Sequence, residues 1–254
     1  MAITDQYLAP PPSPLELHAA IPRTLFVFDF DGTLVETEAR PTDVGVTARI
    51  VHDLEVAAQK FHVMVCSGRG IFDLLRLTKD CPSLDLIGSH GAQWWLSREK
   101  KVRELTGPEW ESWRLQAIPV LDSAVMLRGG ELEDKRASLT LHYKNSGAEW
   151  WTKQEDWLRN LCEGPADLLS GLECWNLIPK GFSKGNALSQ YMDQGEFEQL
   201  IYFGDELTDE TVFSNPSLKT KLFGVKVGQG PTRATRRLPD VKAVQNWLAN
   251  LAAS

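Results

Sequence analysis

Two acidic residues, two positions apart, follow an apolar run in the first part of the chain. The apolar residues 25–28 lead directly into Asp29 and Asp31, and Gly32 comes next. Carboxylates that leave a strand with this spacing can face the same site, and a glycine lets the backbone turn sharply and approach a ligand closely. One carboxylate can then serve as a nucleophile and the other as a proton donor at a single phosphorus centre. The apolar strand before the pair and the Gly-Thr-Leu continuation favour this interpretation over an ordinary acidic turn.

A hydroxyl and a lysine elsewhere in the chain could bind the same phosphoryl group. Ser67, Gly68 and Arg69 follow a second apolar run at residues 62–66. A serine hydroxyl and the backbone N–H groups after it can donate to phosphate oxygens, although a serine at this place can also be a helix N-cap. Lys184 stands in a glycine-bracketed loop before a predicted helix, where it could be either a phosphate ligand or an ordinary surface lysine.

A cluster of acidic residues follows a third apolar run. Residues 204–210 read Gly-Asp-Glu-Leu-Thr-Asp-Glu and come directly after the apolar residues 200–203. Clustered carboxylates repel one another, so such a group indicates a bound cation. Helix N-capping by Thr208 or Asp209 is the alternative, but it leaves Asp205 unexplained.

The elements that must position these residues alternate between strand and helix. Apolar runs predict strands, and helical periodicity predicts the segments between them, which is the pattern of an α/β doubly wound parallel sheet. Ligands of such sheets bind outside the carboxyl ends of the strands, so Asp29, Ser67 and Asp205 should converge on one crevice. The predicted strands are 25–28, 62–66, 84–88, 200–203 and 223–227, and the predicted helices are 46–61, 71–78, 184–192 and 240–251 with Asp240 as N-cap.

The middle of the chain differs in character and holds most of the tryptophans. Helices are predicted over 110–127 and 150–162, and a half-exposed strand over 137–143. The alternation of that strand puts Leu139, Leu141 and Tyr143 on one face and Ser138, Thr140 and His142 on the other. We therefore predict an inserted α+β cap domain at 105–176, a core domain made of 23–104 and 177–254, and a flexible N-terminal tail at 1–22.

Taken in order, the four polar segments resemble the four motifs of the haloacid dehalogenase superfamily over residues 24–250. The resemblance implies that Asp29 attacks phosphorus and forms an aspartyl-phosphate. It implies that Asp31 protonates the leaving oxygen and then activates the hydrolytic water. Ser67 and Lys184 are implied to bind the phosphoryl group.

The same resemblance implies a Mg²⁺ cofactor. Its ligands would be Asp29, Asp205 and the main-chain carbonyl of Asp31. Asp209 would orient the metal's water molecules or Lys184. Mg²⁺ and Lys184 would offset the repulsion between an attacking carboxylate and a phosphate dianion.

Three further segments narrow the resemblance to the trehalose-6-phosphate phosphatases. They are residues 87–92 (Ile-Gly-Ser-His-Gly-Ala), 132–135 (Leu-Glu-Asp-Lys) and 139–143 (Leu-Thr-Leu-His-Tyr). In that family the Glu and Lys of the cap segment bind sugar hydroxyls, and Glu133 and Lys135 stand at those places. The substrate-binding residues expected on this basis are Ser67, Gly68, Arg69, His90, Glu133, Lys135 and Asn176.

Two departures from the family pattern leave the sugar open. Asn176 stands where the family commonly has an acidic residue, and Glu206 stands where it usually has a second aspartate. An amide can still bind hydroxyls, but with a different set of donors and acceptors. A phosphatase of glucosylglycerol, mannosylglycerate or sucrose phosphate is therefore the alternative. A non-catalytic sugar-phosphate sensor and a phosphomutase are weaker alternatives, because all four motifs are present and the cap follows the second motif.

Composition excludes several classes of partner. A formal net charge of −7 over 254 residues, with no extended basic face, argues against a nucleic-acid-binding protein. The four cysteines show no zinc-ligand spacing, and no apolar run approaches the length of a membrane span. The first residues lack the basic and apolar segments of a signal peptide. We expect a cytoplasmic monomer that acts on a small sugar phosphate.

Overall fold

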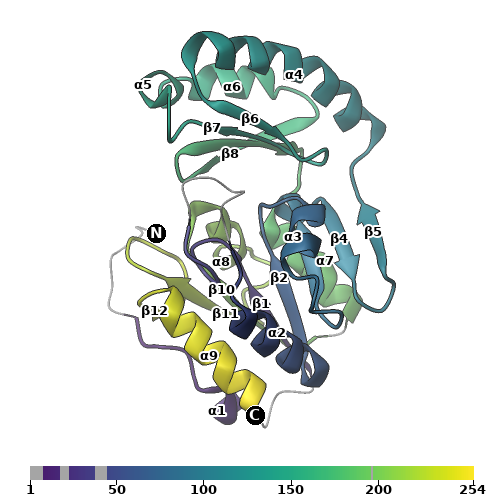
Figure 1. Cartoon of the computed structure of the whole chain (residues 1–254), viewed down its shortest axis with the longest axis vertical. Helices are drawn as coiled ribbons and strands as arrows, with labels where there is room; N and C mark the ends of the chain where they lie inside the picture. The colour runs from purple at the N-terminus through teal and green to yellow at the C-terminus, as the bar shows by residue number, and fades with distance from the viewer. Residues whose placement is uncertain (1–7, 18–22, 38–44, 196) are drawn as a thin grey trace.

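Within the residues that the computed structural model describes (8–17, 23–37, 45–195 and 197–254), eight strands form one sheet and four form a second sheet beyond it (Figure 1). The larger sheet has the order β12-β11-β10-β1-β2-β3-β4-β5, parallel from β12 to β3 and antiparallel over β4 and β5. This confirms the predicted α/β fold with a mostly parallel sheet. Its strands are β1 (Thr24–Phe28), β2 (His62–Cys66), β3 (Asp85–Gly88), β4 (Gln93–Leu96), β5 (Lys101–Glu104), β10 (Gln199–Gly204), β11 (Leu222–Val227) and β12 (Arg236–Leu238).

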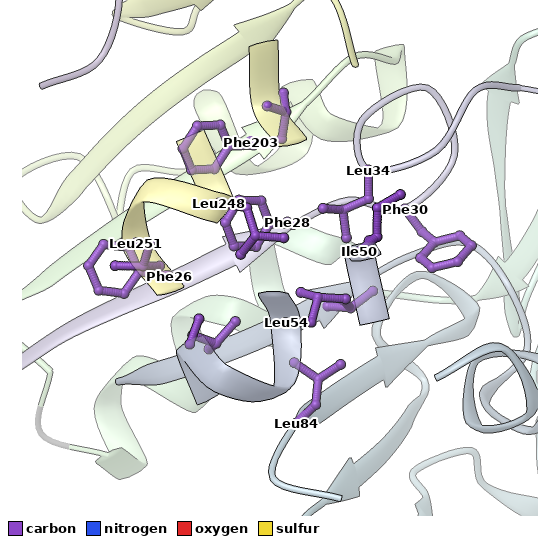
Figure 2. Packing of buried hydrophobic residues seen from close by; sticks show 14 of the residues in the cluster. Phe26, Phe28, Phe30, Leu34, Ile50, Leu54, Leu84, Phe203, Leu248 and Leu251 are labelled. Atoms are coloured by element: carbon purple, nitrogen blue, oxygen red, sulfur yellow. The ribbon is translucent and has the colours of Figure 1, made fainter. Parts of the chain in front are cut away.

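Helices cover both faces of this sheet, so its central strands are apolar on both sides. Phe26 and Phe28 of β1 belong to one hydrophobic cluster, shared with α2 (Ala48–Lys60) and α9 (Val241–Ala253), and Figure 2 shows this packing. Leu25 and Val27 point to the opposite face and pack in a second cluster with α7 (Lys184–Gly195) and α8 (Glu210–Phe213). Burial on both faces explains why β1 reads as a continuous apolar run.

Capping residues fix the starts of the two helices on the first face. Thr47 accepts a hydrogen bond from the Ile50 backbone N–H at the start of α2. Asp240 accepts one from the Ala243 backbone N–H at 2.8 Å, which confirms the N-cap predicted for the last helix. On the edge nearer the cap, α3 (Ile71–Leu77) begins directly after the Ser67–Gly68–Arg69 segment.

The second sheet and its helices form the cap that lies above the carboxyl edge of the larger sheet in Figure 1. Its strand order is β6-β7-β9-β8, all antiparallel. Its core gathers Trp110, Leu141, Trp151 and Leu177. The cap elements are α4 (Pro108–Arg128), β6 (Glu131–Asp134), β7 (Leu139–His142), α5 (Ala148–Trp151), α6 (Glu155–Leu161), β8 (Ala166–Gly171) and β9 (Cys174–Pro179).

Two features of the chain differ in detail from what the sequence pattern predicts. The helix predicted over 150–162 is two helices, and the acidic pair Glu155 and Asp156 lies in the first turn of the second. Acidic residues favour a helix start, which accounts for the break. Strand β9 stays paired with β8 as far as Pro179, so the boundary predicted at residue 177 falls inside a strand. We propose to place the return to the core domain after Pro179.

The face of β7 that was expected to be exposed is largely covered, and only His142 on it stays half-buried. Thr140 is 1% exposed and Ser138 is fully buried. Thr140 lines the cleft between cap and core, where its hydroxyl is hydrogen-bonded to two other cap residues, Lys135 and Asn176. The alternation of apolar and polar residues correctly separated the two faces of the strand. The polar face, however, lines the cleft and does not face bulk solvent.

Part of the predicted N-terminal tail packs on the core. Residues 8–17 are described, whereas the rest of the predicted tail at 1–22 lies outside the described residues. The short helix α1 (Pro14–Leu17) lies beside α9, and the indole N–H of Trp247 donates to the Pro12 carbonyl at 2.9 Å. This stretch is therefore held against the core.

Candidate active site

The carboxyl ends of β1 and β10 bring the two acidic segments together. Asp29 follows β1, and its backbone N–H donates to the Phe203 carbonyl of β10 at 2.8 Å. The strand ladder therefore continues to the residue expected to be the nucleophile. Asp29 is 4% exposed, so its carboxylate lies in a shielded site.

Lys184 links this carboxylate to the acidic cluster. Its Nζ lies 2.9 Å from Asp29 Oδ1 and 2.7 Å from Asp209 Oδ1, at the first residue of α7. Burial opposes its charge, but the two carboxylates outweigh burial and raise the pKa of Lys184 well above its ordinary value. Lys184 is therefore a fixed, buried cation beside the expected nucleophile, not a surface lysine.

Three carboxylates, two buried and that of Asp205 half-buried, lie close enough to share one cation. One oxygen from each of Asp29, Asp205 and Asp209 lies within 4.8 Å of the others. Burial, with the neighbouring acids, raises the pKa of Asp29 well above its usual range and that of Asp205 to about 7, although the Thr33 hydroxyl donates to Asp205 at 2.8 Å. Hard carboxylate oxygens grouped in this way fit Mg²⁺, whose charge would relieve their repulsion.

Asp209 differs from the other two acids because donors already engage both of its oxygens. Oδ1 accepts from Lys184 and from the Tyr202 hydroxyl, at 2.7 and 2.5 Å. Oδ2 accepts from the Glu206 backbone N–H at 2.9 Å. This arrangement suits Asp209 to hold Lys184, and it leaves Asp29 and Asp205 as the better carboxylate ligands for a cation.

Gly32 is required where the two acidic segments meet. Its φ of +74° is a conformation that favours glycine. A Cβ there would lie 2.1 Å from Asp205 Oδ2, so any side chain would displace that carboxylate.

Asp31 lies on the opening of the cleft and is bound by Arg69. Arg69 donates from Nε to Asp31 Oδ2 at 2.6 Å and from Nη2 to Asp31 Oδ1 at 2.7 Å. Its Nη1 donates to Asp73, and its guanidinium lies over the ring of Phe30. Although Arg69 lines the cleft as expected for a substrate-binding residue, these contacts direct it at the expected proton donor.

Ser67, Gly68 and His90 form the adjoining wall. The Ser67 backbone N–H donates to the Ile87 carbonyl, which fixes the loop to β3. A Cβ on Gly68 would lie 2.6 Å from the His90 ring, so glycine makes room for the imidazole. His90 has a left-handed backbone, with φ of 55°.

The imidazole of His90 is buried at the wall of the cleft, and its ring nitrogens can bind a ligand there. Among the described residues neither ring nitrogen makes a hydrogen bond of ordinary geometry, although Asn176 faces the ring. Burial, followed by the nearby charges of Lys135 and Lys184, lowers the pKa of His90 to about 3. The ring is therefore neutral, with one donor and one acceptor for a ligand.

The cap closes the cleft with a polar network on the face of its sheet. Lys135 Nζ donates to the Gly68 carbonyl of the core at 3.0 Å and to the Thr140 hydroxyl at 2.9 Å. That hydroxyl in turn donates to Asn176 Oδ1 at 2.8 Å. The strand register explains the grouping, because Glu133 pairs with Thr140 and Thr140 with Asn176.

Glu133 is the negative member of this network. Its Oε2 lies 2.9 Å from His142 Nε2 and 3.4 Å from Lys135 Nζ. Burial opposes ionisation, but Lys135 and His142 lower the pKa of Glu133 to about 2. Glu133 is therefore a carboxylate that can accept from hydroxyls.

All seven residues expected to bind substrate line this single cleft, together with Asp29, Asp31 and Lys184. Asp205 and Asp209 do not line the cleft, but their carboxylates group with that of Asp29, which does. Sequence reasoning missed further cap residues that line the cleft, and the alternation of β7 could have suggested Thr140 and His142. The missed residues include Glu131, Thr140, His142, Lys144, Asn145 and Glu173.

Comparison with known proteins supports the resemblance read from the motifs. The family model described as trehalose-phosphatase matches residues 27–242. The chain belongs to the trehalose-phosphatase family. It is 31% identical over 240 residues to a trehalose-6-phosphate phosphatase of Escherichia coli, covering 87% of this chain and 84% of that protein.

Solved structures share the fold. The C-terminal domain of a Candida albicans trehalose-6-phosphate phosphatase superposes with a TM-score of 0.82 at 20% identity, covering 98% of this chain and 99% of that one. A haloacid dehalogenase-like hydrolase of Bacteroides thetaiotaomicron gives a TM-score of 0.66 at 14% identity, covering 89% and 98%. The haloacid dehalogenase-like core is thus confirmed. Among the described residues, no helix has the length and apolar character to cross a membrane.

Proposed function

We propose that this protein hydrolyses trehalose 6-phosphate to trehalose and inorganic phosphate. The observation that carries the proposal is the placement of Lys184 between Asp29 and Asp209, at the floor of a cleft whose roof holds Glu133 and Lys135. The floor supplies groups for phosphoryl transfer, and the roof supplies groups for sugar hydroxyls. The family and the E. coli relative support trehalose 6-phosphate as the substrate.

The chemistry follows from the positions of the core residues. An Asp29 carboxylate oxygen attacks phosphorus and forms a P–O bond while the bond from phosphorus to the sugar O6 breaks. Asp31 donates a proton to O6, so that trehalose leaves as an alcohol. Lys184 and the Ser67 hydroxyl hold the charge of the phosphoryl oxygens.

The second half of the reaction regenerates the enzyme. Asp31, now a carboxylate, takes a proton from a water molecule that attacks the aspartyl-phosphate. The bond from phosphorus to Asp29 breaks, and phosphate leaves. The cap covers the site and limits the access of other water.

A Mg²⁺ ion fits the acidic floor. Asp29, Asp205 and the carbonyl of Asp31 would hold it, while Asp209 stays engaged with Lys184. When bound, the ion supplies positive charge that offsets the repulsion between the Asp29 carboxylate and the phosphate dianion. Burial and the neighbouring acids raise the pKa of Asp29 and of Asp205, and a bound cation would offset this cost of keeping both carboxylates charged.

The sugar contacts come from the cap. Glu133 accepts from hydroxyls, Lys135 donates to them, and the neutral His90 can do either. Asn176 accepts a hydrogen bond from Thr140 and faces the His90 ring on this surface. Because Asn176 is an amide where the family commonly has an acid, another glycosyl phosphate is the second candidate substrate.

Phosphate release is the direct test. Wild-type protein is incubated with trehalose 6-phosphate in Mg²⁺, in EDTA, and in EDTA followed by excess Mg²⁺. Glucosylglycerol, mannosylglycerate and sucrose phosphates serve as the comparison panel. Turnover of trehalose 6-phosphate that EDTA abolishes and Mg²⁺ restores supports the proposal. Selective turnover of another sugar phosphate would reassign the substrate to the alternative, and no turnover of any phosphate would overturn the enzyme assignment.

A further inference from the structure

A tyrosine beneath the site makes a hydrogen bond that no step of the proposed reaction uses. Tyr202 is fully buried on β10, and its ring packs edge-on against Phe213 at 5.7 Å. Its hydroxyl donates to Asp209 Oδ1 at 2.5 Å. Packing alone does not require this hydroxyl, because phenylalanine would fill the same space, whereas a buried hydroxyl without a partner costs stability.

The acceptor oxygen is the one that also binds the site lysine. Asp209 Oδ1 receives both the Tyr202 hydroxyl and Lys184 Nζ, and Lys184 Nζ also lies 2.9 Å from Asp29. The four residues thus form one chain of contacts from the core to the nucleophile. Tyr202 stands at its inner end and does not line the cleft.

Asp209 needs this hydrogen bond because the turn that carries its backbone is short and gives its side chain little support. It lies on the three-residue 3₁₀ turn η4 (Leu207–Asp209), and apart from Lys184 and Tyr202 its side chain is held by the Glu206 backbone N–H of the same turn. The tyrosine ring, by contrast, belongs to a central strand packed on both faces. The hydroxyl therefore ties a carboxylate on a turn to the rigid sheet.

We propose that Tyr202 is a positioning residue for phosphoryl transfer: its hydroxyl holds the Asp209 carboxylate so that Lys184 is directed at the phosphoryl site beside Asp29. The inference rests on the proposed phosphatase function. It adds a requirement for the hydroxyl itself, distinct from the requirement for an aromatic ring in the core.

The test compares Tyr202→Phe with a matched control, Tyr191→Phe. Tyr191 also donates its hydroxyl to an aspartate, Asp85 at 2.6 Å, but outside the site. We expect Tyr202→Phe to lower kcat about tenfold and to weaken inhibition by inorganic phosphate, since hydrogen bonds to charged groups are among the stronger ones. Tyr191→Phe should lose comparable thermal stability and keep wild-type kcat.

A double-mutant cycle separates positioning from general destabilisation. In an Asp209→Asn background, Tyr202→Phe should change kcat by less than about twofold, because the carboxylate that it positions is gone. Equal losses in both backgrounds would overturn the proposal. So would a Tyr202→Phe variant with lower melting temperature but unchanged kcat and phosphate inhibition.

A second probe applies where Tyr202→Phe does not fold. Replacing Tyr202 with 3,5-difluorotyrosine keeps the hydroxyl and the ring but changes the donor strength of the hydroxyl. A changed kcat with unchanged melting temperature supports the proposal, and an unchanged kcat contradicts it. An inactive wild-type enzyme would instead be a failure of the proposed function, so the two failures are distinguishable.

Discussion

Both carboxylate oxygens of Asp31 accept hydrogen bonds from one guanidinium, that of Arg69, at 2.6 and 2.7 Å. The pair is bidentate, which fixes the orientation of the carboxylate as well as its contact. Arg69 is held in turn by Asp73 and by the ring of Phe30. Arg69 therefore sets the orientation of Asp31, the expected proton donor.

Arg69→Lys should impair the step in which the leaving group is protonated. Lysine keeps the charge but cannot make the bidentate contact. We expect kcat for trehalose 6-phosphate to fall about 10- to 100-fold, and kcat for p-nitrophenyl phosphate to fall much less, because nitrophenolate leaves without a proton.

Arg76→Lys is the matched control for this prediction. Arg76 donates to the same Asp73 but makes no contact with Asp31 among the described residues. It should leave both activities near wild type. Equal losses on the two substrates in Arg69→Lys would show that Arg69 acts on the phosphoryl group itself.

Lys135→Ala should weaken recognition of the sugar and leave the core chemistry intact. Lys135 reaches Thr140 and Glu133 in the cap and the Gly68 carbonyl in the core. We expect kcat/KM for trehalose 6-phosphate to fall about 10- to 100-fold, because the variant loses hydrogen bonds from a charged group to the sugar. The kcat/KM for p-nitrophenyl phosphate, which has no sugar, should change less than about threefold.

Lys153→Ala serves as its control. Lys153 is an exposed cap lysine paired with Glu149 at 3.7 Å and lies outside the cleft. Its loss should not affect either substrate. If Lys135→Ala lowered the two activities by the same factor, Lys135 would not belong to the sugar site.

The buried imidazole of His90 should make the protein lose stability in acid. The pKa of His90 is about 3 in the folded state, whereas an unfolded histidine has its ordinary value near 6.5. Between these values the unfolded chain binds the extra proton, so the free energy of unfolding falls as the pH falls. Between pH 6.5 and pH 4, His90 alone lowers the free energy of unfolding by roughly 3 kcal/mol.

His90→Asn removes this contribution, and asparagine tolerates the left-handed backbone. Chemical unfolding at pH 6.5 and at pH 4 gives the free energy of unfolding at each pH. The decrease between the two pH values should be smaller in the variant than in the wild type. Identical pH slopes would mean that His90 is not a buried neutral base.

The sequence predicts the floor of the site better than its roof. Asp29, Ser67 and Asp205 each follow an apolar run, and parallel strands bring their carboxyl ends to one edge. Lys184 is separated from Asp29 by more than 150 residues, and its place at a predicted helix start left open whether it was a phosphate ligand or a surface lysine. Only the resemblance to the four motifs assigned it to the site.

The roof depends on which face of the cap sheet is covered, and periodicity does not encode this. Thr140 and His142 alternate correctly with the buried residues of β7, but the pattern cannot distinguish a solvent face from one that meets another domain. The roles of Arg69 and Tyr202 were missed for a related reason. Arg69 acts through a hydrogen bond to Asp31, and Tyr202 through one to Asp209. In each pair the two residues lie on different segments of the chain, and no sequence spacing marks such a bond.

The central claim is that Asp29 is the nucleophile of a trehalose 6-phosphate phosphatase. The most direct test measures phosphate release from trehalose 6-phosphate by Asp29→Asn beside the wild type, both in Mg²⁺, with circular dichroism and melting temperature to establish folding. An amide cannot form the aspartyl-phosphate, so we predict a folded variant whose kcat is lower by about 1,000-fold or more. A folded variant whose kcat stays within about tenfold of the wild type would contradict the account.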